Sequence, residues 1–181
     1  MNLTLHIREN LELRTLDTTD AQTFFDVARK NDTYLRQWLP WLDEDKTVAD
    51  TENYIKGSNE RFIKNEGLDL SIWYDNQLVG GIGLYPVDTT HKKTSVAYWL
   101  AEEFQGKGIM TDSLKVVISY AFIEMKLNRL EVCCAIGNIK SSALPKKLGF
   151  VFEGISRESE WWYEHFIDME VYSLLAKEWK E

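Results

Sequence analysis

The sequence predicts a single-domain α/β fold of the α+β type, with a central, mainly antiparallel mixed sheet flanked by helices. Hydrophobic residues recur at helical spacing in some segments and alternate in others, in the order strand, two helices, three strands, helix, strand, helix and two strands. The 181 residues suit one domain with a sizeable core, and we find no repeat, linker or low-complexity segment. The domain is therefore expected to span residues 1–181, with the fold core at about 10–176.

The first third of the chain reads as a strand followed by two helices. Apolar and polar side chains alternate over residues 11–16, which predicts the first strand. Thr18 or Thr19 can then cap a helix, because a hydroxyl at this position accepts a hydrogen bond from the first helical turn. The segment at residues 38–42 interrupts this region, and a second helix is expected over residues 48–64.

From residue 68 the hydrophobic period changes to two. Strands at residues 68–74 and 78–84 are joined by a turn at Asp75-Asn76, and Pro86 is expected to end the second one. A third strand at residues 96–100 completes this meander. The elements that follow are expected to be a helix with an apolar face from Leu114 to Met125, a strand at 130–136, a short helix at 138–148, and two strands near 150–156 and 166–175.

Charge and composition restrict the partners of this protein. The net charge of −8 argues against nucleic acid, because binding to phosphate backbones needs concentrated positive charge. We find neither a membrane-spanning segment nor a leader pattern, so a cytoplasmic protein with no membrane partner is expected. Cys133 and Cys134 would point to opposite faces of a strand, which argues against a structural disulfide. The histidines are isolated from one another, and no metal site is expected.

A glycine-containing run between the third meander strand and the next helix is the clearest functional signal. Its residues are Gln105, Gly106, Lys107, Gly108, Ile109, Met110 and Thr111. A turn that opens a helix gathers unpaired backbone N–H groups at the positive end of the helix dipole, where phosphate oxygens bind. The run lacks the Gly-Lys-Thr/Ser ending of the triphosphate P-loop, and no GxGxxG follows it.

This run resembles the Gln/Arg-x-x-Gly-x-Gly/Ala pyrophosphate loop of the GNAT N-acetyltransferases. Further along, Asn138-Ile139-Lys140-Ser141, Lys147-Leu148-Gly149-Phe150 and Glu153-Gly154 are similar to the signature of the branch that includes RimL. Enzymes of that branch acetylate the N-terminal amine of ribosomal proteins. One departure is Met110, which stands where the wider family usually has Gly or Ala, and it narrows the resemblance to the RimL-like branch.

The resemblance implies an acetyl-CoA-dependent N-acetyltransferase acting on a primary amine, with the N-terminal α-amine of a ribosomal protein as the expected acceptor. The N–H groups of residues 105–111 would bind the pyrophosphate of coenzyme A, with Lys107 as an additional cation. A backbone N–H at Trp99, Leu100 or Ala101 would stabilise the developing oxyanion, because in this family that strand splays from its neighbour.

Two proton transfers are needed, since the acceptor amine must lose a proton and the departing thiolate must gain one. By the resemblance, Glu160 takes the first proton, directly or through water, with Glu158 and Glu164 as nearby alternatives. Ser141 occupies the position that supplies the second proton, and its hydroxyl is also a natural cap for the short helix. The side-chain amide of Asn138 is expected to contact the pantetheine arm of coenzyme A.

Two other functions stay open at this point. One is a small-molecule acetyltransferase for a polyamine or an amine antibiotic, which the net charge of −8 would favour by attracting cations. The other is a non-catalytic coenzyme A sensor, against which Glu160 and Ser141 argue, because a sensor needs neither proton-transfer group.

Aromatic clusters form the last signal, and they could wall the acceptor groove, cover the core or form a subunit contact. Because they exceed what a sheet of this size needs, a homodimer is expected. The clustered residues are Trp38, Trp41, Trp161, Trp162 and Tyr163.

Overall fold

The described part of the chain contains one sheet of eight strands, in the spatial order β1-β2-β3-β4-β5-β6-β8-β7. The computed structural model describes residues 3–180. Neighbouring strands run antiparallel except β5 and β6, which run parallel, so the predicted mainly antiparallel mixed sheet is confirmed. The strands are β1 (Thr4–Arg8), β2 (Leu11–Thr15), β3 (Leu68–Tyr74), β4 (Gln77–Asp88), β5 (Lys93–Leu100), β6 (Arg129–Ala135), β7 (Val151–Trp162) and β8 (His165–Leu175).

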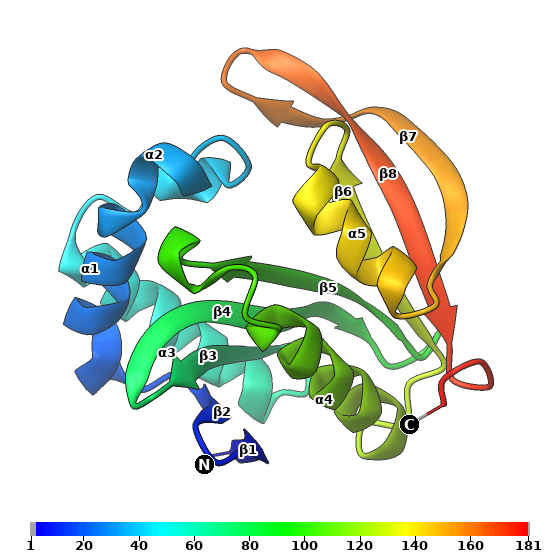
Figure 1. Ribbon diagram of the computed structural model, residues 1–181, viewed down its shortest axis with the longest axis horizontal. Coiled ribbons are helices and arrows are strands. Elements are labelled where there is room, and N and C mark those ends of the chain that lie inside the picture. The colour runs from blue at the N-terminus through cyan, green and yellow to red at the C-terminus, as the bar shows by residue number, and fades with distance from the viewer. Residues whose placement is uncertain (1–2, 181) are drawn as a thin grey trace.

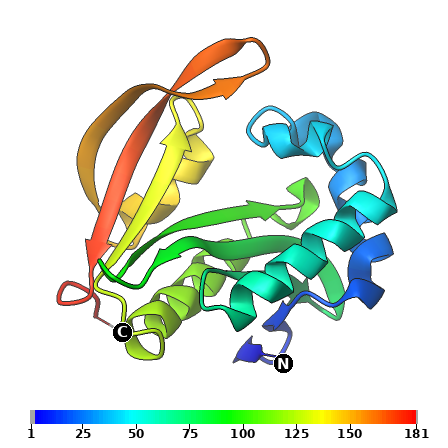
Figure 2. The ribbon, with the colours of Figure 1, turned by 180° about the vertical axis from the view of Figure 1, so that it is seen from behind.

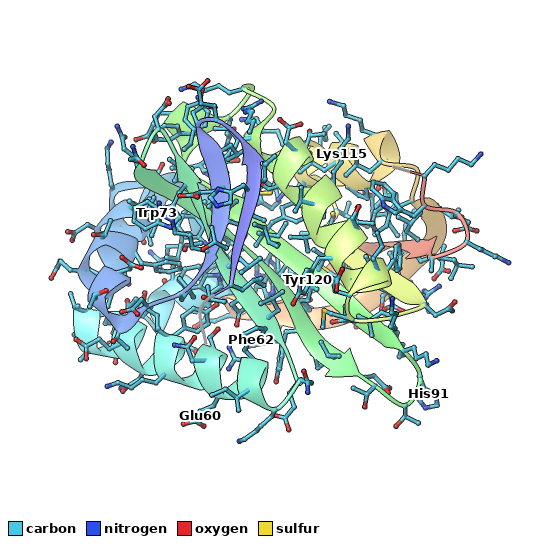
Figure 3. The ribbon with its side chains drawn as sticks, turned by 90° about the horizontal axis from the view of Figure 1, so that it is seen from below. Glu60, Phe62, Trp73, His91, Lys115 and Tyr120 are labelled. Atoms are coloured by element: carbon cyan, nitrogen blue, oxygen red, sulfur yellow. The ribbon has the colours of Figure 1, made fainter. Side chains whose placement is uncertain are left out.

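Helices cover both faces of the sheet. α4 and α5 lie on one face, whereas α3 lies on the other with α1 beside it (Figures 1 and 2). The view from below separates α3 and α4 across the strands (Figure 3). Within residues 3–180 no helix is both long and apolar enough to cross a membrane. The helices are α1 (Ala21–Lys30), α2 (Asp32–Leu35), α3 (Val48–Ile63), α4 (Ile109–Ile123) and α5 (Ile139–Lys147), with 3-10 turns at Thr18–Asp20, Pro40–Asp43 and Glu102–Phe104.

The main hydrophobic core lies between the sheet and α4. Side chains alternate along β3, so Leu68, Leu70 and Ile72 turn to this face and are buried there. They belong to one cluster with Leu114 and Ile118 of α4, both fully buried. The apolar stripe predicted for α4 therefore packs as expected.

A smaller core joins α1 and α3 to the opposite face of the sheet. It contains Phe24 of α1, Ile55 of α3 and Leu78 of β4. Asp69 and Ser71 alternate with the buried leucines along β3, so their side chains face α1 and α3. This side of the sheet is consequently more polar than the α4 side.

The turn between β3 and β4 is the one that the sequence predicts. Asp75 and Asn76 have φ angles of 49° and 58°, both in the left-handed region. A two-residue type I′ hairpin requires this conformation at both central positions, and Asp and Asn tolerate it better than most residues. The turn fixes the register of β3 against β4 and hence the face on which Asp69 lies.

β5 and β6 pair only briefly before they separate. Residues Lys93–Ser95 of β5 pair with Arg129–Glu131 of β6, and no later residue of either strand is paired with the other. Beyond that point β5 stays with β4 as far as Leu100, while β6 stays with β8 as far as Ala135. The sheet therefore opens into a V between two halves (Figures 1 and 2).

Several details of the sequence-based assignment are wrong. Asp17, not Thr18 or Thr19, provides the first cap: its carboxylate accepts the Thr19 N–H at 2.9 Å, because a 3-10 turn precedes α1 and moves the capping position forward. β4 continues past Pro86 to Asp88 through a register shift, and Met125 lies beyond the end of α4.

The sequence analysis also missed β1 and α2 and ended β7 too early. β1 is an edge strand without buried residues, and α2 spans only four residues, so neither gives a strong periodic signal. β7 extends to Trp162, because an irregularity between Ser156 and Glu160 hides its alternation.

Close packing of β4 on β5 yields a stability prediction. A Cβ at Gly80 would lie 2.3 Å from the carbonyl oxygen of Trp99, so Gly80→Ala should lower the free energy of unfolding by about 1–3 kcal/mol through overpacking. Gly57→Ala inside α3 is the matched control, since its Cβ would meet only Arg61 Nη1 at 3.5 Å. It should raise the free energy by about 0.5–1 kcal/mol. Urea denaturation measures both, and equal effects would contradict this account.

Candidate active site

The glycine turn before α4 presents a row of unpaired backbone N–H groups. Gly106 and Gly108 have φ angles of 74° and 76°, and Gly108 is the N-cap of α4. The N–H groups from Gly106 to Thr111 have no hydrogen-bond acceptor among the described residues. A Cβ at Gly106 would meet nothing within 4 Å, so the turn is open to a ligand. The predicted position of this loop, at the start of the helix after β5, is confirmed.

Positive charge gathers around this turn in spite of the acidic chain. The Lys107 ammonium lies 4.7 Å from the centre of the Phe104 ring. Lys140 Nζ, from the first turn of α5, donates a 2.9 Å hydrogen bond to Gln105 Oε1. Asp112, in the first turn of α4, forms a 2.8 Å ion pair with Arg8, so its charge is compensated. Together with the helix dipole, these groups favour an anion at the turn.

The opening of the V exposes one edge of β5. The Ala101 N–H donates to the Val79 carbonyl at 2.8 Å, so this amide is committed to the sheet, contrary to the expectation of free amides from Trp99 to Ala101. Successive N–H groups of a strand alternate in direction, so the Leu100 N–H points away from β4, into the opening. Leu100 therefore offers the free donor of this segment.

Asn138 and Ser141 have different roles at the start of α5 from those expected. Asn138 caps the helix, because its Oδ1 accepts the Ser141 N–H at 3.1 Å; Ser141 is not the cap. The Ser141 hydroxyl is left free for other contacts, and it lies 3.3 Å from both the Tyr98 hydroxyl and Cys134 Sγ. The Tyr98 hydroxyl also donates to the Ser141 carbonyl at 3.0 Å.

Tyr98, Ser141 and Cys134 thus form a hydrogen-bonded cluster of proton donors on the α4–α5 side of the opening. Burial raises the pKa of Tyr98, and burial likewise raises the pKa of Cys134. Both groups are therefore protonated at neutral pH. Sequence reasoning missed Tyr98 and Cys134, although the alternation of Tyr98 with Trp99 indicates that these neighbours face opposite sides.

Glu160 lies on the other side of the opening, on β7. Its Oε2 accepts the indole N–H of Trp162 at 2.8 Å, and the carboxylate is otherwise exposed. Trp162 is buried against Ala135, with Trp38 packed on the same cluster. The pKa of Cys133 is raised by burial first, then by the charges of Glu131 and Glu160. Glu160 therefore lies near the face of β6 that carries Cys133, opposite Cys134. Glu160 and Ser141 therefore approach the opening from opposite faces.

The two alternative carboxylates are placed differently. Glu158 lies in the irregular stretch of β7 with φ 49°, and its N–H donates to Asp168 at 2.8 Å. Glu164 is in the turn between β7 and β8, with φ 70°. The Trp162 hydrogen bond distinguishes Glu160 from both.

A cavity of about 610 Å³ opens on the α3 side of β3, β4 and β5. Gly81 and Gly83 contribute to its floor, where absent side chains leave room. A Cβ at Gly81 would come within 2.7 Å of Trp99 Nε1, and one at Gly83 within 2.5 Å of Asp69 Oδ1. The glycines thus seat the indole of Trp99 and the carboxylate of Asp69. Of the predicted aromatic clusters, Trp41 lines this cavity and Trp38 does not.

The β7–β8 hairpin contacts α2 across the opening. The Tyr163 hydroxyl donates to the Arg36 carbonyl at 2.7 Å, and the Arg36 guanidinium lies 5.5 Å from the Tyr163 ring. This contact connects the two halves of the V at its outer end. Among residues 3–180, no cluster of three metal-ligating side chains is present.

Comparisons with known proteins agree with this geometry. The acetyltransferase (GNAT) domain model matches residues 10–151. Over 179 residues the chain is 35% identical to YdaF of Bacillus subtilis (strain 168), which is named provisionally as a ribosomal N-acetyltransferase; the match covers 98% of this chain and 97% of YdaF. The ribosomal-protein-serine acetyltransferase of Escherichia coli (strain K12) is 25% identical over 173 residues, covering 96% and 97% of the two chains.

Solved structures share the fold. RimL, described as a ribosomal L7/L12 alpha-N-protein acetyltransferase in complex with coenzyme A, superposes with a TM-score of 0.92 at 23% identity. The superposition covers 96% of this chain and 98% of that one, and it supports the likeness of fold. The matching domain model and the relative at 35% identity show that this chain belongs to the GNAT acetyltransferase family.

Proposed function

We propose that this acetyltransferase modifies the N-terminal α-amine of a protein, with a ribosomal protein in the cytoplasm as the expected acceptor class. The observation that carries this proposal is the opening between β5 and β6, which an amine can approach beside the exposed carboxylate of Glu160. An α-amine has a pKa of about 7.7–8.0 and a lysine amine about 10.4, so the α-amine demands less of its base. The ribosomal-protein-serine acetyltransferase of Escherichia coli supports the same acceptor class.

Acetyl-CoA is the cosubstrate of this family, and it supplies an acetyl thioester when bound. The residues at the α4 turn fit its pyrophosphate, because unpaired N–H groups from Gly106 to Thr111 meet the helix dipole there. Lys107 and Lys140 add positive charge. The proposed role of Asn138 changes in one respect, since its Oδ1 caps α5 and only its NH₂ is free for the pantetheine arm.

The chain's own groups can serve each step of the transfer. Glu160 takes the ammonium proton of the acceptor, and the Leu100 N–H stabilises negative charge that develops on the carbonyl oxygen. Ser141 gives a proton to the departing thiolate. Before transfer the Ser141 hydroxyl donates to the Tyr98 hydroxyl at 3.3 Å, and Tyr98 stays protonated because burial raises its pKa.

A small cationic amine is the second candidate acceptor. The cavity beside Trp99 favours it, because 610 Å³ or so suits a small molecule and several carboxylates line the walls. Acetyl-CoA consumption with N-terminal peptides, α-blocked lysine and small amines separates the candidates. The peptides should give the highest kcat/KM, and acetylation of none of these amines would support a coenzyme A sensor.

We also propose a homodimer formed through β7. This strand is at the edge of the sheet, and its apolar side chains other than Trp162, together with Phe166 of β8, are more than half exposed, which marks a surface for a partner. The residues are Val151, Phe152, Ile155, Trp161 and Phe166.

The cofactor assignment predicts the effect of a side chain at the glycine turn. Gly108→Val should weaken coenzyme A binding sharply in calorimetry, because a β-branched side chain resists a φ of 76° and crowds the N–H groups. Gly149→Val, at a φ of 81° after α5, carries comparable backbone strain away from the turn and should keep its affinity. Unchanged affinity in a folded Gly108→Val protein would show that the pyrophosphate binds elsewhere.

The base assignment predicts a pH-dependent loss of activity. Glu160→Gln should lower kcat by about 10²–10⁴-fold near pH 7 while coenzyme A still binds. The deficit should shrink as pH rises past the α-amine pKa of about 7.7–8.0, because the free amine then exists without a base. Ser141→Ala should slow turnover without this recovery, since its proton goes to the leaving group. Glu158→Gln is the matched control; if it shows the loss instead, the base is Glu158.

The dimer proposal predicts the molecular mass of the protein in solution and a substitution that lowers it. Light scattering at tens of micromolar should give twice the chain mass, and Ile155→Glu on β7 should give a monomer, because a buried charge disfavours the contact. Ile63→Glu, at another exposed apolar position on α3, should leave the dimer intact. A monomeric wild-type protein would refute the homodimer.

A further inference from the structure

The cavity on the α3 face carries more carboxylates than cations. Glu44, Asp45, Asp50 and Asp69 line it, and Arg61 is the single cationic lining residue in the described chain. Arg61 is already paired, since its Nη2 lies 2.9 Å from Asp69 Oδ2. The other three carboxylates form no ion pair with any side chain among residues 3–180. The cavity is therefore negatively charged.

Asp45 is the carboxylate best placed to hold a cation. It is half-buried between the Pro40–Asp43 turn and α3, and burial is the main cause that raises its pKa. The Thr51 hydroxyl lies 2.8 and 3.0 Å from its two oxygens and is their only side-chain donor in the described part of the chain. A partly desolvated carboxylate with a single hydroxyl partner gains from a cation that approaches it.

Aromatic rings lie on the same walls. The Trp41 and Trp99 ring centres are 6.4 Å apart, and Phe24 packs edge-on against Trp99 at 5.3 Å. Aromatic faces beside a carboxylate bind organic ammonium and guanidinium groups, because the ring quadrupole and the negative charge attract the same cation.

The cavity already contains one example of this arrangement. Arg61 pairs with Asp69, and its guanidinium lies 5.1 Å from the Tyr85 ring centre and 5.9 Å from that of Tyr54. The walls near Asp45 repeat the combination of carboxylate and aromatic rings, with Trp41 and Trp99 in place of the tyrosines. Arg29 lies behind Asp45, where it donates to the main-chain carbonyls of Leu42 and Asp45 and pairs with Asp32, but it does not line the cavity.

The cavity also adjoins the reacting strand. Trp99, which lines it, precedes Leu100, whose N–H faces the opening. On the other side, Leu39 and Trp41 line the cavity, while Trp38 packs with Trp162, the hydrogen-bond donor to Glu160. An acceptor with its amine beside Glu160 can therefore extend past residues 38–41 into the cavity.

We propose that the cavity binds a second cationic group of the acceptor, an ammonium or guanidinium on an aliphatic arm, against Asp45 and between Trp41 and Trp99. The inference rests on the proposed function, because it places the amine to be acetylated beside Glu160. Lysine or arginine next to the N-terminal residue of a protein would supply the group, and so would the far ammonium of a diamine. Neutral and acidic acceptors would leave the carboxylates uncompensated, so the site selects by charge.

Kinetics of the unmodified enzyme test this first. Three tetrapeptides that begin with serine carry lysine, norleucine or glutamate at the second position, and 1,4-diaminobutane is compared with butylamine. The lysine peptide should exceed the norleucine peptide in kcat/KM by about 10–100-fold, the range of a hydrogen bond to a charged group, and glutamate should be the poorest. A larger value for the diamine than for the lysine peptide would support the cation site and identify a small molecule as its source.

Variants then locate the site. Asp45→Asn should lower kcat/KM for the lysine peptide to about that for the norleucine peptide, because the substitution removes the charge and keeps the size of the side chain. Glu52→Gln, an exposed carboxylate of α3 that does not line the cavity, should keep the preference. Coenzyme A affinity and thermal unfolding verify that each variant is folded.

The outcomes separate this inference from the proposed function. Equal kcat/KM for lysine and norleucine peptides would overturn the inference and leave peptide acetylation standing. A lysine preference that survives in folded Asp45→Asn protein would overturn the assignment to this cavity. If coenzyme A binds but no peptide or amine is acetylated, the proposed function is wrong and the inference falls with it.

Discussion

The separation of β5 from β6 is the constraint on which the site depends. The strands share three residue pairs and then part, while each keeps its other neighbour. Backbone N–H and C=O groups on the parted edges need partners, and a substrate can provide them where the protein does not. Both α4 and α5 begin near this opening, at Gly108 and Asn138, so one interruption of the sheet brings together a strand edge and two helix starts.

Alternation along the strands gives the two faces of the opening different chemistry. Tyr98 and Cys134 turn to the α4–α5 side, where they meet Ser141, while their neighbours Trp99 and Cys133 turn to the other side. The first face has proton donors and unpaired N–H groups, which suit a phosphate-bearing donor and its leaving thiolate. The second face has carboxylates and indoles, which suit an amine. Lys107 and Lys140 thus lie on the first face in spite of the acidic chain.

Local patterns in the sequence predicted most of the fold but only part of the site. The alternation of apolar and polar side chains predicted β3, Asp75-Asn76 predicted its turn, and the glycine run predicted the start of α4. These features depend on residues that are neighbours in the sequence. Edge strand β1 and the one-turn helix α2 bury too little to leave a pattern. The contact of Tyr98 with Ser141 joins residues 43 positions apart, so no local signal reveals it.

The cavity could not be predicted from the sequence either, because its lining residues are far apart in the chain. Asp45, Asp69 and Trp99 come from separate elements, and they meet only because glycines at 81 and 83 leave the floor of the sheet bare. The resemblance to the family marked the donor half of the site and, on the acceptor side, Glu160. The rest of the proposed acceptor half is built from residues that lie far apart in the sequence, so its arrangement exists only in the folded chain.

The hydrogen bond from Tyr163 to the Arg36 carbonyl has a topological consequence. It closes a ring that runs from β5 through α1 and α2, across to the β7–β8 hairpin, and back along β6 to the point where the two strands pair. A polypeptide can enter a ring as a single strand at its terminus. An internal loop must enter as two strands side by side and therefore needs a wider opening. Under the proposed function, the closed ring favours a chain terminus over an internal loop by shape alone, before any charge or proton is involved.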